Sequence, residues 1–165
     1  MVPSSILTRC EEPDDAARVE ALQRAAFGPG AYARAAFRVR EKAAHDLALS
    51  FLTEEDGALI ASVRMTPVSI GSFAGFLLGP LVVEPAKKGL GHGRALVRKA
   101  VKAAAASGTF VILVGDEPYY GPLGFKPLPP GRVRMPGPVD PARLLAAELS
   151  PGTIAMLQGP VRAGL

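Results

Sequence analysis

The chain has 165 residues, and 19 lysines and arginines against 15 aspartates and glutamates give a net charge of +4. Its only cysteine, Cys10, excludes an intrachain disulfide and a cysteine-based metal site. With only His45 and His92, a histidine-rich metal cluster is excluded as well. This length is typical of one domain, so we expect a single domain over residues 1–165.

Composition also narrows the location and the partners. No apolar run approaches the roughly 20 residues that cross a bilayer, and the first residues do not have the pattern of a signal peptide, so we expect a cytoplasmic protein without a membrane partner. The mild positive charge suits an anionic ligand. Nucleic acid is disfavoured as a partner, because aromatic residues are sparse and no dense basic run interrupts the chain.

The first elements are a strand and a helix. Residues 5–9 form a short strand candidate, and the acids and proline of residues 11–15 are typical of a helix start. The pattern predicts a helix over residues 14–27, ended by Gly28-Pro29-Gly30. The residues expected on its buried side are Ala17, Leu22 and Ala25 or Ala26.

A second helix is expected over residues 31–44. Its outer side would carry Arg34, Arg38, Arg40 and Lys42. Two apolar runs follow, residues 47–52 and 58–65, and the Asp56-Gly57 pair between them is a strong hairpin signal. These two strands should therefore be antiparallel neighbours.

The centre of the chain reads as strand, glycine-rich turn, helix and strand. Residues 76–83 form an apolar, β-branched run that suits a buried strand, and residues 109–114 form a second one. Between them lie the turn of residues 88–94 and a helix that stops near Gly108. The predicted buried face of this helix comprises Leu96, Val97, Ala100, Val101, Ala104 and Ala105.

The last quarter predicts shorter elements. Residues 125–128 read as a short strand, and the proline-rich residues 129–138 as a loop. A helix over residues 141–149 and a final strand over residues 153–158 would complete the fold.

The glycine-rich turn suggests a phosphate site. The first turn of a helix leaves backbone N–H groups unpaired and carries partial positive charge, and glycine allows close approach. A dinucleotide-binding fingerprint requires glycine at the position of Arg94, and a P-loop requires Gly-Lys-Ser/Thr where the chain has Gly93-Arg94-Ala95, so both motifs fail.

Three motifs in order resemble those of the GCN5-related N-acetyltransferases (GNAT). Lys88-Gly89-Leu90-Gly91-His92-Gly93 resembles the pyrophosphate-binding Gln/Arg-x-x-Gly-x-Gly/Ala motif, with lysine at the first position. Leu81-Val82-Val83-Glu84-Pro85 resembles the preceding strand end, and Tyr120-Gly121-Pro122-Leu123-Gly124-Phe125 resembles Tyr-x-x-x-Gly-Phe. The closest likeness, over residues 46–128, is to a branch of bacterial acetyltransferases of unassigned substrate.

The resemblance implies an α/β (α+β) fold and a cosubstrate. The expected sheet is mixed and mostly antiparallel, with about 6 to 7 strands, about four flanking helices and a splayed central strand pair. Acetyl-CoA is the implied cosubstrate, with no metal. The backbone around the turn would hold its pyrophosphate, and the strand end would pair with pantetheine and the thioester. The residues implied for this binding are Leu81, Val82, Val83, Lys88, Gly89, Leu90, Gly91, His92, Gly93 and Arg94. Pro80 fits the splay, but it equally fits a simple β-bulge.

The resemblance also implies catalytic groups. Tyr120 matches the tyrosine of the third motif and would act as general acid, since a phenol stays protonated at neutral pH; Tyr119 is the alternative. Glu84 is our candidate general base, and Asp116 and Glu117 are alternatives. Asp116 could instead cap the turn that carries the tyrosines.

The expected reaction is direct acetyl transfer to a primary amine, without a covalent enzyme intermediate, for which Cys10 is a weak candidate. The acceptor could be a small molecule, a peptide or a protein. Rival interpretations are a different acyl donor, a noncatalytic acyl-CoA-binding or regulatory module, and a basic nucleic-acid-binding domain. Many members of the family pair, so a homodimer is compatible with the resemblance.

Overall fold

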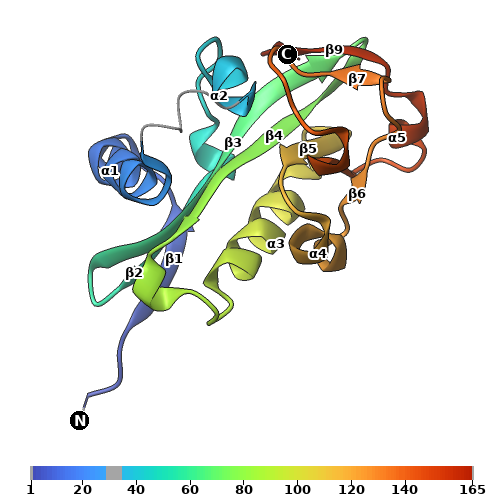
Figure 1. Cartoon of the computed structure of the whole chain (residues 1–165). Coiled ribbons are helices and arrows are strands. Elements are labelled where there is room, and N and C mark those ends of the chain that lie inside the picture. Colours follow the sequence, from blue (N-terminus) through green and yellow to red (C-terminus); the bar gives the residue numbers. More distant parts are fainter. Residues whose placement is uncertain (1, 29–34, 165) are drawn as a thin grey trace.

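The computed structural model describes residues 2–28 and 35–164, and in them nine strands join into one twisted sheet (Figure 1). The strands are β1 (Ile6–Cys10), β2 (Phe51–Glu55), β3 (Ala58–Ile70), β4 (Phe73–Val83), β5 (Phe110–Val114), β6 (Lys126–Pro127), β7 (Val133–Arg134), β8 (Leu144–Glu148) and β9 (Gly159–Ala163). The α-helices are α1 (Ala16–Phe27), α2 (Ala35–Arg40), α3 (His92–Ala104), α4 (Glu117–Tyr120) and α5 (Thr153–Met156).

The sheet is mixed and mostly antiparallel. Its main path runs β1-β2-β3-β4-β5-β8-β6, and β9 pairs with the second half of β3 and with β7. Only β4–β5 and β7–β9 are parallel pairs among the described strands. The expected α/β fold with a mostly antiparallel sheet is confirmed, with short additional strands near the C-terminal end.

The predicted hairpin is present. β2 and β3 are antiparallel neighbours, and the loop between them is Asp56-Gly57. Asp56 has φ 51° and Gly57 φ 84°, the two positive values that a tight hairpin of right-handed twist needs. The first strand of the hairpin, β2, begins at Phe51 and not at residue 47 as expected. Residues 47–49 instead form a 3-10 turn, in which the Ala48 backbone N–H donates to the Asp46 carboxylate.

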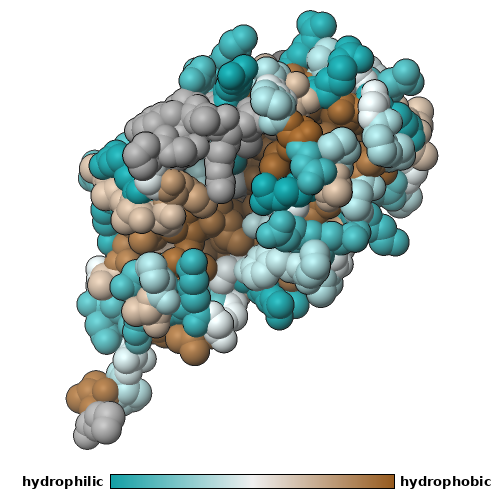
Figure 2. Space-filling view, in the orientation of Figure 1, coloured by the Kyte–Doolittle hydropathy of each residue, from teal (hydrophilic) through white to brown (hydrophobic). Residues whose placement is uncertain are grey.

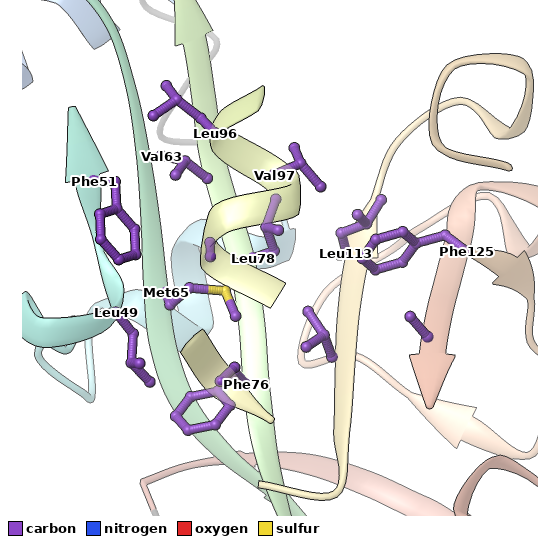
Figure 3. Close-up of a cluster of buried hydrophobic side chains, with 14 of the residues drawn as sticks. Leu49, Phe51, Val63, Met65, Phe76, Leu78, Leu96, Val97, Leu113 and Phe125 are labelled. Carbon is purple, nitrogen blue, oxygen red and sulfur yellow. The ribbon is translucent and has the colours of Figure 1, made fainter. Parts of the chain in front are cut away.

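One face of the sheet packs against α3 (Figures 1 and 3). Leu96 and Val97 of the helix face β3 and β4 in the same cluster as Val63 and Leu78 (Figure 3). The predicted buried face of α3 is confirmed at four positions, namely Leu96, Val97, Ala100 and Ala104. Val101 is half-buried, and Ala105 lies just beyond the helix and is exposed.

The opposite face lies under α1 and α2 (Figure 1). The buried residue of α1 is Val19, so the predicted buried set is wrong in detail: Leu22 is only half-buried, and Ala17, Ala25 and Ala26 are exposed. At the end of α1, Ala26 and Phe27 border an open cleft instead of the core.

The second predicted helix ends earlier than expected, at Arg40 instead of residue 44. Within the described residues it spans α2, after which the chain turns, and residues 31–34, with Arg34, lie outside the description. Arg38 and Lys42 are exposed as predicted. Arg40 is not on the outer side: it is half-buried and lines the same cleft, because Val39 beside it anchors the helix in the second core cluster.

Two C-terminal predictions are wrong. Residues 141–149 form a 3-10 turn followed by β8, and residues 153–158 contain α5, with the last strand following as β9. The run Leu144–Leu145–Ala146–Ala147 is buried throughout, since β8 lies between β5 and β6. A strand buried on both faces loses its alternating pattern and cannot be told from a helix by periodicity.

Candidate active site

The central strands β4 and β5 separate after a short parallel contact. Their ladder contains the pairs Phe76–Val111 and Leu77–Ile112, whereas β4 continues to Val83. From Leu78 onward, the edge of β4 that faces β5 is therefore outside this ladder. The expected splay of the central strand pair is confirmed.

A β-bulge lies where the strands separate. Val63 pairs with Leu81 and Met65 with Leu78, so Gly79 and Pro80 together oppose the single residue between them on β3. Gly79 has φ 126°, which a residue with a side chain rarely adopts. The sequence left a splay and a bulge as alternatives for Pro80, and the structure has both.

The separated strands open into a cleft of about 830 Å³. It extends along β4 from Leu78 to Val83 and reaches the turn before α3, the tyrosines at the end of α4 and the end of α1. Figure 2 shows hydrophobic surface in the hollow between α1 and the α3–α4 side of the molecule, with hydrophilic residues around it. This volume falls within the roughly 300–1,000 Å³ of small-molecule sites.

The glycine-rich turn forms one end of the cleft. Gly89 and Gly91 have φ 79° and 90°, and Gly91 is the N-cap of α3 without a side-chain capping bond. A Cβ placed on either glycine would meet nothing within 4 Å, so the turn is open toward the cleft. The first amides of α3 therefore present unpaired donors and the positive end of the helix dipole.

The structure brings nine of the ten expected donor-binding residues to this cleft. They are Leu81, Val82, Val83, Lys88, Gly89, Gly91, His92, Gly93 and Arg94. Leu90 is not among the lining residues, and its side chain is 66% exposed. Lys87, which the sequence did not single out, also lines the cleft, and its ammonium group lies 2.6 Å from the Glu55 carboxylate.

Both adjacent tyrosines line the cleft. The rings of Tyr119 and Tyr120 meet edge to face at 4.8 Å, and the Arg94 guanidinium lies 5.4 Å from the centre of the Tyr119 ring. Burial raises the pKa of the Tyr119 phenol above its ordinary value, although the Arg94 charge opposes the shift. Tyr120 packs against Gly115 and, at 6.0 Å between ring centres, against Phe125.

The candidate bases lie in different places. Glu84 is half-buried at the end of β4, where its backbone N–H donates to the Ile60 carbonyl at 2.8 Å, and it is not a lining residue. Asp116 lines the cleft and accepts a hydrogen bond from Arg143 Nε at 3.1 Å. Its side chain makes no capping bond to α4. Glu117 does not line the cleft.

Sequence reasoning missed the lining residues that come from distant segments. Arg40 at the end of α2, and Asp140 and Arg143 before β8, meet the central motif only after folding. Arg40 had been expected on an outer face, Arg143 belonged to the wrongly predicted helix over residues 141–149, and Asp140 directly precedes that range. Within one sequence, no local pattern brings these three segments together.

The remaining candidates are distributed as follows. His92 lines the cleft, whereas His45 lies elsewhere and its Nε2 is 2.9 Å from Glu11 Oε2. Cys10 is exposed and is not a lining residue.

In the part of the chain that the structure describes, no three His, Cys, Asp or Glu residues gather to hold a metal ion. None of the helices described there has the length and apolar composition of a membrane span.

Comparison with known proteins identifies the family. The model of the acetyltransferase (GNAT) family matches residues 16–119. An uncharacterized N-acetyltransferase of Escherichia coli K12, YhbS, is 31% identical over 124 residues, which cover 73% of this chain and 74% of that protein.

Solved structures agree in fold. The E. coli YhbS structure, determined in complex with CoA, has a TM-score of 0.81 and 23% identity, covering 99% of this chain and 92% of that one. A Brucella melitensis GNAT family acetyltransferase in complex with acetyl-CoA has a TM-score of 0.70 and 30% identity, covering 96% and 95%. The family model matches more than half of this chain, so the chain belongs to the acetyltransferase (GNAT) family and is an acyltransferase.

Proposed function

We propose that this protein binds acetyl-CoA in the cleft between β4 and β5 and transfers the acetyl group directly to a primary amine. The observation that carries the proposal is the cleft itself: a strand edge released from its ladder leads to an open glycine turn at the start of a helix. Relatives of similar fold were solved with CoA and with acetyl-CoA.

The donor would be held mainly by backbone groups. The first amides of α3, at His92, Gly93 and Arg94, fit an anionic diphosphate, and the exposed side chains of Lys88 and Arg94 add positive charge. Leu90 would contribute through its backbone only, as its side chain points away into solvent.

The strand end would hold the rest of the donor. Because β4 leaves its ladder with β5 before Leu81, Val82 and Val83, the main-chain groups of these residues are placed to pair with the pantetheine amides and the thioester carbonyl. Their side chains contribute an apolar wall to the same cleft. This is the binding that the sequence motif implied.

The reaction exchanges a C–S bond for a C–N bond. The amine nitrogen attacks the thioester carbon, the bond to sulfur breaks, and the departing thiolate takes a proton. We assign Tyr120 as the donor of that proton. An unperturbed phenol, with a pKa of about 10, is protonated at neutral pH and can give its proton to a thiolate whose parent thiol has a pKa of about 8.5.

The amine must also lose a proton. Glu84 would accept it through water, because its side chain stands at the end of β4 outside the lining. Asp116 is the alternative, with its carboxylate already bonded to Arg143. An amine that arrives neutral would need neither group.

The test combines binding with product analysis. We expect CoA to bind the purified protein in calorimetry, and a panel of primary amines with acetyl-CoA to yield an acetylated product detected by mass. Thiol release without an acetylated amine would indicate hydrolysis only. A protein that binds CoA but acetylates no amine would be a noncatalytic module, and one that ignores CoA would refute the proposal.

A further inference from the structure

We infer that Leu78 and Leu113 close the inner end of the cleft and thereby limit this enzyme to short-chain acyl-CoA donors. The inference rests on the proposed function, since it concerns the acyl group of the same donor. It starts from the two central strands: the β4–β5 ladder ends at the pair Leu77–Ile112, and Leu78 and Leu113 are the next residues on the two strands.

The two leucines lie where the strands begin to separate. Both line the cleft, yet Leu78 is only 3% exposed and Leu113 only 1% exposed. A residue that borders a cleft but is otherwise enclosed by its neighbours belongs to the wall of the cleft and not to its rim. Leu78 and Leu113 therefore form the closed end of the cleft, and the glycine turn lies at the other end of the same strand edge.

The core supports this wall from behind. Both leucines belong to the hydrophobic cluster under α3, and Figure 3 shows one of them on each strand within that cluster. Phe76 and Val111, which pair just before the strands separate, are buried in the same cluster. Because protein interiors are packed as densely as organic crystals, the leucines cannot retreat without displacing these neighbours.

The proposed donor approaches the wall from the open end of the cleft. Its diphosphate would bind at the glycine turn, which follows β4 in the chain, and its thioester carbonyl would pair with the strand near Leu81. The donor therefore runs from the turn toward the point where β4 and β5 meet. The acyl group is its leading end, so the acyl group is the part that meets Leu78 and Leu113.

The distance between the thioester and the wall limits the chain length. The strand from Leu81 back to Leu78 spans at most roughly 10 Å, at about 3.3 Å per residue. Carbon atoms in van der Waals contact stay about 4 Å apart, so roughly 6 Å of this span remains for the acyl chain. An acetyl or a butyryl group fits within that length. An octanoyl chain exceeds it and would have to displace the leucines.

The test uses donors that differ only in chain length. Acetyl-, butyryl- and octanoyl-CoA are assayed with an amine from the panel on the wild type, Leu78→Ala and Leu113→Ala, and CoA binding is measured on each protein. The control is Leu49→Ala, because Leu49 is 7% exposed in the same core cluster but does not line the cleft. Leu113→Val, a smaller truncation, replaces any alanine variant that circular dichroism shows to be unfolded.

We expect kcat/KM of the wild type for octanoyl-CoA to be at least about 100-fold below that for acetyl-CoA, because even one misfitting methylene costs about 10- to 200-fold. Butyryl-CoA should stay closer to acetyl-CoA. Leu78→Ala and Leu113→Ala should each raise the octanoyl-to-acetyl ratio by about 10-fold or more, and Leu113→Val by less. Leu49→Ala should keep the wild-type ratio, since a loss of stability lowers the rates with all donors alike.

Several outcomes would overturn the inference. A wild type that uses octanoyl-CoA as well as acetyl-CoA contradicts it and would indicate that the acyl chain turns toward α1 instead. Unchanged donor ratios in the variants of Leu78 and Leu113, or an equal gain in Leu49→Ala, contradict it as well. In each of these cases an amine is still acylated, so the proposed function stands. Failure of CoA to bind the wild type, or of every donor to acylate an amine, would refute the proposed function and the inference with it.

Discussion

The hydroxyl of Tyr119 occupies the space that a side chain on Gly93 would need. A Cβ on this glycine would lie 2.5 Å from the Tyr119 oxygen and 3.3 Å from Val83 Cγ2. The glycine of the motif therefore does more than expose amides: it lets a tyrosine from α4 pack on the first turn of α3. One residue links the proposed diphosphate site to the segment that carries both tyrosines.

The substitution Gly93→Ala should disturb this contact. Overpacking costs about 1–3 kcal/mol, while the better helix propensity of alanine offsets up to about 1 kcal/mol, so we expect a net loss near 1 kcal/mol in urea unfolding and weaker CoA binding in calorimetry. The double variant Gly93→Ala/Tyr119→Phe removes the clashing oxygen and should recover stability. If Gly93→Ala is as stable as the wild type, the packing argument fails.

Replacing each of the two tyrosines by phenylalanine should lower kcat to different extents. Tyr120→Phe removes the proposed proton donor, and general acid catalysis contributes about 10²- to 10⁴-fold, so kcat should fall by that order with CoA affinity retained. Tyr119→Phe keeps the ring under Arg94 and should lower kcat by less than about 3-fold. Steady-state rates and CoA titrations on both variants decide; a larger loss in Tyr119→Phe would transfer the role to that residue.

The glycine turn should tolerate no side chain at Gly91. Its φ of 90° at the N-cap of α3 is strained for any other residue. Gly91→Ala should therefore lower the free energy of unfolding by about 1–2 kcal/mol and weaken CoA binding in calorimetry. Ala95→Gly, in the exposed second turn, is the matched change that leaves the proposed site alone. Equal CoA affinity in Gly91→Ala and wild type would contradict the assigned diphosphate site.

The motif region could be predicted from the sequence because its signals are local. The Asp56-Gly57 hairpin, the buried face of α3 and the glycine turn each depend on residues within a few positions of one another. Pro80 signalled interrupted pairing through its missing N–H. The strand edge and the turn that form most of the cleft were therefore predictable.

The part of the cleft that Arg40, Asp140 and Arg143 form was not predictable, because tertiary contacts determine it. Arg40 was expected in solvent, yet burial of Val39 turns it toward Gly79. Leu144 and Leu145 favour a helix by propensity, but pairing with β5 and β6 makes them a strand, which brings Asp140 and Arg143 to the cleft.

Acid should weaken the N-terminal part of the sheet. Arg9 and Arg18 both bond to Asp15 and to Glu54, linking β1, α1 and β2. The hydrogen bond from Arg9 holds the pKa of Asp15 well below its usual range despite burial, and the bond from Arg18 similarly lowers the pKa of Glu54. Glu11 behaves alike: burial would raise its pKa, but bonds from His45 and Arg64 lower it.

The direction of the pH effect follows from linkage. A carboxylate whose folded pKa is depressed stabilises the fold above its unfolded pKa, about 4 to 4.5, and that stability is lost as pH falls through the folded value. We therefore expect the free energy of unfolding in urea to be level from pH 7 to about 5 and to decline below about 4.5. Asp15→Asn should be less stable at pH 7 and should decline less steeply, because its largest contributor is already gone. A wild type that gains stability between pH 5 and 3 would contradict the network.

Removing Glu11 should be costly at neutral pH. Its side chain is 1% exposed and accepts two hydrogen bonds from Arg64, at 3.0 and 2.9 Å, so Glu11→Ala leaves a guanidinium that is only 10% exposed without its main counter-charge. Breaking a buried pair from one side costs about 3–5 kcal/mol. Thermal and urea unfolding should show that loss, and Glu41→Ala, an exposed acid after α2, should stay within about 0.5 kcal/mol of the wild type. The double variant Glu11→Ala/Arg64→Met also removes the charge that lost its partner, so it should regain stability. Arg64 lies opposite Gly79 and Pro80 on β3, so its loss could also disturb the bulge. If the double variant is no more stable than Glu11→Ala, the cost does not come from the stranded charge and the bulge depends on Arg64 itself.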